Sequence, residues 1–419
     1  MSDKKIKVLT ISDIPLSTSG VGLQTRNFIE ALLKTGKYKV VSIGGAIKHN
    51  SYNPIKTKEW GDDFVVYPVD GFGNEGTIRS ILRNEKPDVV WIMTDPRFFE
   101  WLWIMDNEIR SLVPLVYYHV WDNYPYPTFN KKWYESNDKI VSISKVTHNV
   151  VQNVAPEVDC EYLPHAVDDQ TFKPLEESVV EKIRKENFSD DSDKFIFFWN
   201  NRNARRKMSG SLIFWFKEFL DKVGHDKACL LMHTNPKDEN GPDLESIIAE
   251  LGLIDGQVLF STNKLQTTEL AAIYNMVDCT INISDAEGFG LATLESLSCG
   301  TPIIVNMTGG LQEQVTNGEE WFGLPLYPAS KAVIGSQNVP FIYEDRINKD
   351  DFLAALTKMY EMSKEERDSM GKAGREHVLE NYSYEKYQQR WAEIIDEVHS
   401  KHGSWKNRKN YKPWKMEIL

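Results

Sequence analysis

The sequence is poor in cysteine and has no long run of hydrophobic residues. Its four cysteines, Cys160, Cys229, Cys279 and Cys299, lack the paired spacing of a zinc site or a disulfide framework, so we expect reduced, buried thiols. No apolar run approaches the ~20 residues of a membrane-spanning helix, and the charged residues 1–7 lead directly into a predicted strand, without the hydrophobic region of a signal peptide. We therefore expect a soluble, cytoplasmic protein without a transmembrane segment.

Basic charge is also scarce, since 49 Lys and Arg residues face 61 Asp and Glu residues, a net charge of −12. The excess of acid lies in residues 169–400, with 24 basic and 39 acidic groups, whereas residues 1–168 carry 19 and 21. Residues 401–419 are the exception, with six basic groups and one acidic group. This distribution argues against general nucleic-acid binding over the whole surface.

The chain is long enough for two domains, because 419 residues exceed what one ordinary hydrophobic core supports. Residues 5–12 are predicted to form a buried strand, followed by a loop, a helix and a second strand at residues 38–43. This order is typical of a doubly wound α/β sheet, in which ligands bind beyond the carboxyl ends of the strands. Gly20 and Gly22 fall in the first such loop, where a plain tight turn is the alternative.

The most informative stretch is residues 284–310. A strand-like run at residues 279–283 leads into a glycine-rich turn, and a helix is predicted over residues 292–298. Gly288 and Gly290 have no Cβ, so a ligand can approach the backbone closely. The free N–H groups of the helix's first turn can then face a phosphate or a sugar hydroxyl.

Glu287 and Glu295 stand on either side of this turn. A carboxylate can accept hydrogen bonds from two neighbouring hydroxyls, so one glutamate suits a sugar and the other a ribose. Taken singly, Glu295 could be a solvated helix residue and Glu287 an anion that favours a helix N-terminus.

A basic loop follows the strand predicted at residues 195–199. It contains Arg202, Arg205, Arg206 and Lys207, four cations that repel one another unless they share an anion. Guanidinium groups suit a diphosphate, and a solvated basic loop is the alternative.

Two further features carry weaker signals. His119 lies at the carboxyl end of a strand predicted at residues 114–118, where a histidine is as readily a structural hydrogen-bonding group as a ligand contact. Asp191 and Asp193 form a DxD sequence, but it lies in a charged, polar stretch, and we assign no metal there.

Several of these features occur together at fixed spacings. Glu287-Gly-Phe-Gly-Leu, Glu295, Cys299-Gly-Thr-Pro and Gly309-Gly310 together resemble the nucleotide-sugar motif of retaining glycosyltransferases of family 4. The resemblance extends from Lys7 to about Val398. It implies the α/β GT-B fold, two facing Rossmann-like domains with a cleft between them.

The resemblance also implies a division of the chain. Residues 1–168 would form the N-terminal, acceptor domain, and residues 169–194 a linker. Residues 195–382 would form the donor domain, and residues 383–419 a helix that returns to the first domain, followed by a basic aromatic tail.

The implied activity is transfer of a hexose or pentose from a nucleoside diphosphate sugar, most simply a UDP-sugar, to an acceptor hydroxyl. The anomeric configuration would be retained, without a metal or other cofactor. The implied catalytic residues are Glu287, His119, Arg202 and Lys207. The implied donor-binding residues are Gly20, Gly22, Arg202, Lys207, Gly288, Phe289, Gly290, Leu291 and Glu295.

One segment departs from the family pattern, and the tail lies beyond the resemblance. Residues 317–348 mix aromatic residues with prolines, which predicts an ordered, irregular insertion whose role the sequence does not assign. The tail, residues 401–419, interleaves Trp405, Tyr411 and Trp414 with its cations. It could pack its tryptophans on the final helix, or bind an anionic acceptor such as a nucleic acid or a glycan, or a lipid surface.

Other functions are consistent with the same residues. A DNA-modifying glycosyltransferase would act on a hydroxylated base. A GT-B relative could instead be an epimerase or a phosphorylase, and a third alternative is a nucleotide-sugar binder without catalysis. The sequence does not identify the base, the sugar, the acceptor or the oligomeric state.

Overall fold

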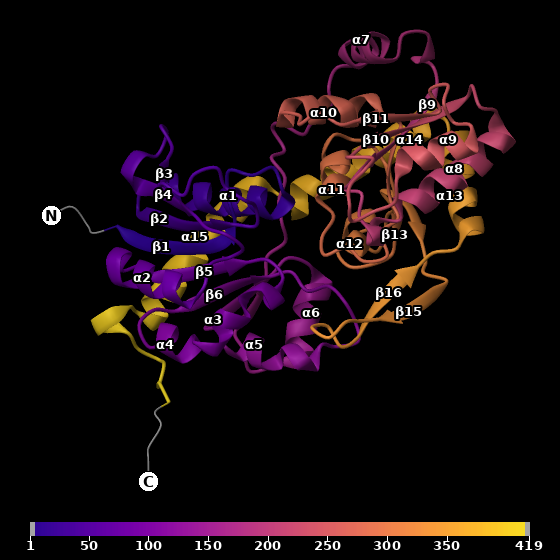
Figure 1. Ribbon diagram of the computed structural model, residues 1–419. Helices are drawn as coiled ribbons and strands as arrows, with labels where there is room; N and C mark the ends of the chain where they lie inside the picture. Colours follow the sequence, from indigo (N-terminus) through magenta and orange to yellow (C-terminus); the bar gives the residue numbers. More distant parts are fainter. Residues whose placement is uncertain (1–4, 415–419) are drawn as a thin grey trace. The chain divides into compact units, whose positions relative to one another are not determined.

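The computed structural model describes residues 5–414 and contains two compact units (Figure 1). The first comprises Met1–His165 and Glu385–Leu419, and the second Ala166–Tyr384. Each unit is built on its own parallel sheet, as the predicted α/β class requires. The expected linker, residues 169–194, falls within the second unit and is largely helical, because α7 spans Glu177–Phe188.

The first unit contains an eight-stranded sheet in the order β3-β4-β2-β1-β5-β6-β7-β8. Neighbouring strands are parallel except for β3 and β4. The strands are β1 Ile6–Asp13, β2 Tyr38–Gly45, β3 Ile55–Lys56, β4 Phe64–Pro68, β5 Val89–Met93, β6 Leu115–His119, β7 Lys139–Ser142 and β8 Cys160–Tyr162. Strands β2, β3 and β4 lie on one side of β1, and the strands that follow in sequence, β5 to β8, lie on the other side. The strand order therefore reverses between β1 and β5.

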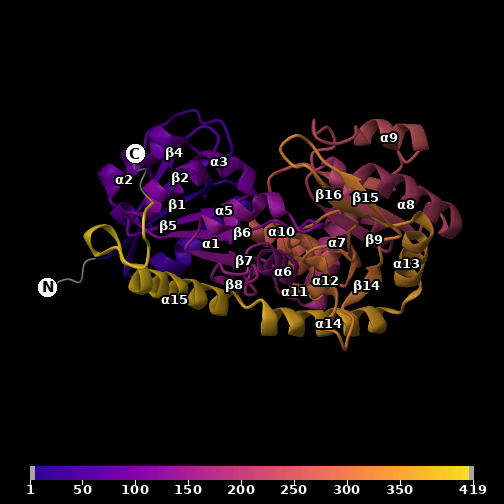
Figure 2. The same cartoon turned by 90° about the horizontal axis from the view of Figure 1, so that it is seen from below.

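The last long helix completes the core of the first unit. Trp391 of α15 is fully buried, and its ring lies edge-on to Phe28 of α1 and Trp91 of β5, with centroid distances of 4.9 and 5.9 Å. Figure 2 shows α15 running along the sheet beside α1. The helices of this unit are α1 Gly20–Leu33, α2 Glu75–Glu85, α3 Glu100–Ile104, α4 Asp106–Arg110, α5 Lys131–Glu135, α6 Lys145–Val154 and α15 Tyr384–His402.

The second unit contains a six-stranded parallel sheet in the order β11-β10-β9-β12-β13-β14. Its strands are β9 Phe195–Asn200, β10 Ala228–His233, β11 Val258–Ser261, β12 Cys279–Asn282, β13 Ile303–Asn306 and β14 Gly323–Leu326. The strand order reverses between β9 and β12, so the carboxyl ends of these two strands mark the expected ligand position.

Helices on both faces bury this sheet, with Phe197, Trp199 and Phe216 among the large side chains of the core. The helices of this unit are α7, α8 Ser209–Val223, α9 Leu244–Leu251, α10 Thr267–Met276, α11 Leu291–Ser298, α12 Leu311–Val315, α13 Lys349–Glu361 and α14 Lys364–Asn381, of which α7 buries no residue. Ser363 and Glu366 form the capping box that begins α14. Among the described residues, none of the helices is both long and apolar enough for a membrane span.

The prediction that residues 317–348 are irregular is wrong. Strand β14 joins the edge of the six-stranded sheet, and β15 Ser330–Ile334 pairs with β16 Ile342–Arg346 as an antiparallel hairpin. Pro325 is tolerated because β14 is an edge strand. Both faces of β15 are largely exposed, so its sequence lacks the alternation that would have predicted a strand.

The tail belongs to the first unit as far as the structure describes it. The backbone N–H of Trp405 donates to the Leu112 carbonyl (2.6 Å), and its indole N–H donates to the Pro87 carbonyl (2.8 Å). Trp405 therefore lies against the segments that precede β5 and β6, and not on the final helix, which was one of the alternatives for the tail. Residues 415–419, the end of the predicted basic tail, lie outside the described residues.

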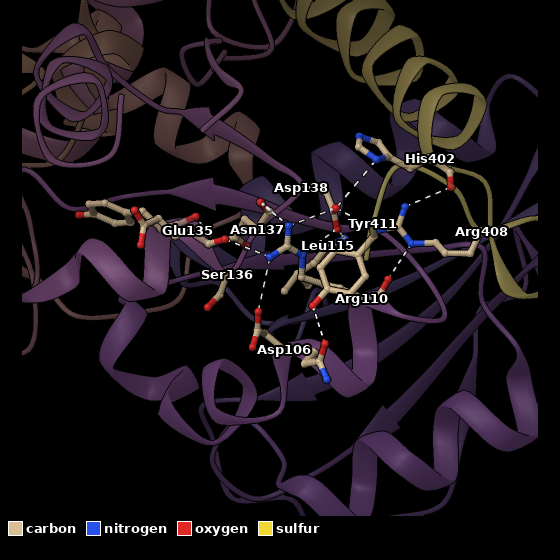
Figure 3. Close-up of polar contacts among 12 residues, drawn as sticks. Asp106, Arg110, Leu115, Glu135, Ser136, Asn137, Asp138, His402, Arg408 and Tyr411 are labelled. Carbon is tan, nitrogen blue, oxygen red and sulfur yellow. Dashed lines mark hydrogen bonds and ion pairs between the residues drawn. The ribbon is translucent and has the colours of Figure 1, made fainter. Parts of the chain in front are cut away.

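Arg408 holds the tail in place (Figure 3). Its guanidinium donates to Asp138 Oδ1 (2.9 Å) and to the Arg110 carbonyl (2.7 Å), and both side chains of the ion pair are almost completely buried. Tyr411 lies over the guanidinium of Arg110, 4.8 Å from ring centroid to Cζ. These contacts use tail residues that we considered for an anionic acceptor, so the tail gives no support to that hypothesis.

Candidate active site

Two loops meet at the carboxyl edge of the second sheet. Strand β9 ends at Asn200 and leads into residues 201–208, and β12 ends at Asn282 and leads into residues 283–290. Because β9 and β12 are hydrogen-bonded neighbours at the reversal of strand order, the basic loop and the Glu287 loop lie side by side. We call residues 284–290 the donor loop.

Lys207 and Glu287 form an ion pair between these loops. Both side chains are mostly buried, 8% and 12% exposed, and Asn282 Nδ2 donates to Glu287 Oε2 (3.3 Å). Burial acts to raise the pKa of Glu287, but the charges of Lys207 and Arg206 outweigh it and lower that pKa. Glu287 is therefore held as a carboxylate at neutral pH, with a cation beside it.

Glycines on both sides allow the backbone to close around Glu287. Gly309 has φ +48°, and a Cβ there would lie 1.7 Å from the Glu287 carbonyl oxygen. The N–H of Gly310 donates to the same oxygen (3.1 Å). Gly290 has φ +92°, and a Cβ there would lie 2.5 Å from Leu311 Cδ2. Only glycine fits these positions without strain.

The donor loop ends at the N-terminus of α11. Gly290 is the N-cap residue and Leu291 the first helical residue, and no side chain caps this end. Phe289 is buried, whereas Gly288 and Leu291 are partly exposed. The first turn of α11 therefore retains the N–H groups that can bind an anion.

Glu295 lies one turn inside α11 and is only 6% exposed, so it is not the solvated helix residue that the sequence alone allowed. Its carboxylate accepts a hydrogen bond from the Tyr274 hydroxyl (2.8 Å), which in turn accepts one from Asn200 Nδ2 (2.8 Å). Burial raises the pKa of Glu295 to about 7.

Arg202 and Lys207 have different partners. Arg202 donates from Nε and Nη2 to Asp238 (2.7 and 3.1 Å), and its side chain is 64% exposed, whereas Lys207 is buried against Glu287. Asp238 lies in the loop after β10, a neighbour of β9. The sequence interpretation did not include Asp238, because only the sheet order brings it near Arg202.

The other two cations of the basic loop are also paired. Arg205 binds Glu344 of β16, and Arg206 donates to the Ala286 carbonyl. The four cations thus have separate partners within the protein. Glu344 was also not predicted as a partner of the basic loop, because it lies in the insertion, to which the sequence analysis assigned no role.

In the first unit, His119 is the last residue of β6 and is completely buried. Its Nε2 lies 2.9 Å from the Tyr134 hydroxyl. Burial lowers the pKa of His119 to about 3, so the imidazole is neutral at physiological pH.

Gly20 and Gly22 begin α1, directly after the loop that follows β1. The Ser19 hydroxyl accepts from the N–H of Gly22 (3.0 Å) and donates to Asp13 Oδ2 (2.6 Å). A Cβ at Gly22 would lie 2.1 Å from Ser17 Oγ and 2.9 Å from the Ile14 carbonyl oxygen, so a larger residue would displace Ser17 and crowd the backbone of this turn.

No group of three or more His, Cys, Asp or Glu side chains within residues 5–414 is arranged to hold a metal ion. In the DxD sequence, Asp191 pairs with Lys194 (2.9 Å), the residue that precedes β9.

Comparison with known proteins gives a family match for the second unit. Residues 179–377, which contain the basic loop and the donor loop, match the family model described as Glycosyl transferases group 1.

Among curated proteins, trehalose synthase from Pyrococcus horikoshii is 24% identical over 306 residues, 71% of this chain and 64% of that protein. N-acetyl-alpha-D-glucosaminyl L-malate synthase from Bacillus anthracis is 22% identical over 239 residues, 56% of this chain and 58% of that protein. The chain thus spans less than two thirds of the length of these relatives.

Solved structures match over nearly the whole chain. Sucrose-phosphate synthase from Thermosynechococcus elongatus aligns with a TM-score of 0.75 and 15% identity, covering 95% of this chain and 100% of that one. HepE from Anabaena, in complex with UDP and glucose, aligns with a TM-score of 0.69 and 14% identity, covering 93% and 99%. These similarities confirm the predicted GT-B fold, with its two Rossmann-like domains.

Proposed function

We propose that this protein is a retaining glycosyltransferase that moves a sugar from a nucleoside diphosphate sugar to an acceptor hydroxyl. The observation that carries the proposal is the buried Lys207–Glu287 pair beside the uncapped N-terminus of α11. Both lie at the reversal of strand order and within the residues that match the family model. Retention of configuration rests on the resemblance to family 4.

The diphosphate would be bound by Arg202, Lys207 and the first N–H groups of α11. These donors are in place before charge develops on the leaving diphosphate, so they would stabilise the transition state electrostatically. Arg202 would exchange Asp238 for a phosphate, and its exposed side chain leaves room for that movement. This stabilisation is the reason that we propose catalysis without a metal or other cofactor.

The remaining site residues take the roles that the resemblance implies. Glu287 would accept hydrogen bonds from the hydroxyls of the transferred sugar, and Glu295 from the ribose. His119 would act at the donor sugar as a neutral hydrogen-bonding group, in keeping with its low pKa. Gly20 and Gly22 would leave room for the donor phosphates beside the backbone.

A UDP-sugar is the proposed donor. HepE, a structural neighbour, was solved with UDP and glucose, and a second neighbour from Escherichia coli was solved with UDP-2-fluoro glucose. Whether a hexose or a pentose is transferred depends on the donor that turns over.

The acceptor is proposed to be a small anionic molecule with hydroxyl groups. Two similar proteins carry names with such molecules in them, a D-inositol 3-phosphate glycosyltransferase and a sucrose-phosphate synthase. The nucleic-acid alternative rested on the basic aromatic tail, whose Trp405 and Arg408 contact the first unit.

Incubation with a panel of UDP-sugars tests the proposal. For the transferase we expect slow release of UDP and free sugar without acceptor. With a hydroxylated anionic acceptor, UDP release should be faster and the sugar should appear on the acceptor. An epimer of the donor without UDP release would indicate an epimerase, and binding without any product would indicate a binding protein. The Glu287→Gln variant is the matched control, because it should lose turnover in the first case.

A further inference from the structure

The inserted hairpin is attached to the donor loop through Asp285. The backbone N–H of Asp345 in β16 donates to the Asp285 carbonyl (2.8 Å), and the N–H of Asp285 donates to the Arg206 carbonyl (2.8 Å). Asn306, at the end of β13, donates from Nδ2 to the carbonyls of Ser284 (2.9 Å) and Asp345 (2.7 Å). The basic loop, the donor loop and β16 are thus joined into one hydrogen-bonded layer.

Glu344 connects the same segments through its side chain. It is 2% exposed and accepts hydrogen bonds from both terminal nitrogens of Arg205 and from Arg346 Nη2 (2.9 Å). Burial acts to raise the pKa of Glu344, but the bonds from Arg205 and Arg346 outweigh it and lower that pKa. One buried carboxylate therefore fixes the insertion to the basic loop.

Asp285 is a buried carboxylate whose own position depends on the insertion. Its side chain is 1% exposed, and neither oxygen has a hydrogen-bond partner among the described residues. Arg346 Nε lies 3.9 Å from Asp285 Oδ2, and burial together with Glu344 raises the pKa of Asp285 to about 6. A buried carboxylate without hydrogen bonds is costly, so its tolerance here depends on the nearby guanidinium groups.

We propose that β16 is a positioning element for the donor loop, with Glu344 and Arg346 as positioning residues that set the place of Glu287. Asp285 is two residues before Glu287, and the Gly309–Gly310 turn holds the Glu287 carbonyl from the other side. The donor loop is thus held by β16 at its start and by this turn at Glu287. The inference rests on the proposed function and gives a role to the insertion and to Arg205.

The expected consequence is an effect on turnover and not on nucleotide binding. A displacement of Glu287 misplaces the group that contacts the sugar, whereas Arg202 is carried by the basic loop and remains available for the diphosphate. Because a displacement of about 1 Å at a reacting group can cost on the order of 100-fold in rate, we expect Glu344→Gln to reduce kcat about tenfold or more. The Kd for UDP should stay within about twofold, and KM should change little.

The experiment compares Glu344→Gln and Arg346→Gln with Val333→Ser, using UDP and UDP-glucose as probes. Arg346 is 43% exposed, so its replacement tests the inference even if the buried Glu344 variant folds poorly. Val333 lies on β15 of the same hairpin and is 64% exposed, so its replacement should change nothing. Amide hydrogen exchange of residues 284–290 should be faster in the two β16 variants only.

Two results would overturn the proposal. In the first, both β16 variants match the wild type in kcat and in exchange of the donor loop. In the second, UDP affinity falls as much as kcat, which would make β16 part of the nucleotide site. If the wild type neither binds nor turns over UDP-glucose or another nucleotide sugar, the proposed function fails, and hydrogen exchange alone still decides whether β16 holds the loop.

Discussion

At the scale of single residues, Glu287 is the carboxylate assigned to the sugar, and Glu287→Gln tests that assignment. We expect turnover to fall by at least about 100-fold, because the amide loses the charge that favours a developing positive centre and donates where an acceptor is needed. Affinity for UDP should change only a few-fold by titration calorimetry. An equal loss of affinity for bare UDP would place this carboxylate at the nucleotide instead.

Arg202 and Lys207 are the cations assigned to the diphosphate, and a series of alanine variants ranks them. Arg202→Ala and Lys207→Ala should each weaken UDP binding by ~2 kcal/mol or more, as expected for a lost charge-assisted hydrogen bond. Arg205→Ala should have a smaller effect on affinity, because Arg205 is bound to Glu344. Calorimetry that ranks Arg205 above both others would mean that the wrong members of the basic loop were chosen.

The raised pKa of Glu295 predicts how the free energy of unfolding changes with pH. Its pKa is raised by burial from 4.5 to about 7, so between these values the folded state holds a proton that the unfolded state has released. The contribution of Glu295 to the free energy of unfolding is therefore greatest below about pH 4.5, and it is lost as the pH rises to about 7. Glu295→Gln removes the dependence, so the variant should gain on the order of 2–3 kcal/mol relative to wild type over that interval.

Urea unfolding at about pH 4.5 and about pH 7.5 measures this difference. Glu250→Gln, at an exposed position of α9, is the control. A stability difference between Glu295→Gln and wild type that stays constant with pH would show that folding does not raise the pKa of Glu295.

At the scale of elements, the tail is a structural part of the first unit. Arg408→Ala removes one of the two arginines that pair with buried Asp138, and Arg110 remains. We expect a loss of about 2 kcal/mol, less than the full cost of isolating a buried charge. Lys406→Ala, at an exposed tail position, should stay within about 0.5 kcal/mol. If Arg408→Ala is as stable as the wild type but transfers sugar to the acceptor more slowly, the tail has a role in acceptor binding.

The elements predicted correctly from the sequence are the buried strands of the two parallel sheets. Strands β1, β6, β9 and β12 are apolar runs with parallel neighbours, and their positions were predicted to within a residue or two. Strand β15 of the hairpin was missed because both of its faces are largely exposed, so it carries no periodic pattern. Its prolines suggested irregular structure, although Pro328 and Pro340 lie just outside the strands.

Some residues of the candidate site could be predicted from the sequence, and others could not. Glu287 and Lys207 were chosen from local motifs, and the structure brings them into contact. Asp238 and Glu344 could not be chosen, because they reach the basic loop from segments 36 and 139 positions further along the chain. Local spacing in the sequence identifies charged groups that can bind a ligand or take part in catalysis. The residues that neutralise these groups depend on the order of strands in the sheet.

At the scale of the whole molecule, the two units differ in how the chain builds them. Ala166–Tyr384 is continuous and has its own core, so this fragment should unfold cooperatively and bind UDP by calorimetry. Residues 1–165 alone should fail to fold cooperatively, because they lack α15 and its buried Trp391. A cooperative thermal transition in the 1–165 fragment would show that α15 is not needed for that core.

Trp391 lies on the last long helix, yet it fills the core of the unit that begins the chain. During synthesis on the ribosome, residues 166–384 emerge between the first unit's sheet and that helix, which takes roughly 10 to 45 s at about 5–20 residues per second. The second unit can therefore fold first, although it comes second in the sequence. For that interval the nascent chain presents Phe28, Trp91 and Tyr118 without their partner, a hydrophobic surface that we expect a general chaperone to occupy until translation ends.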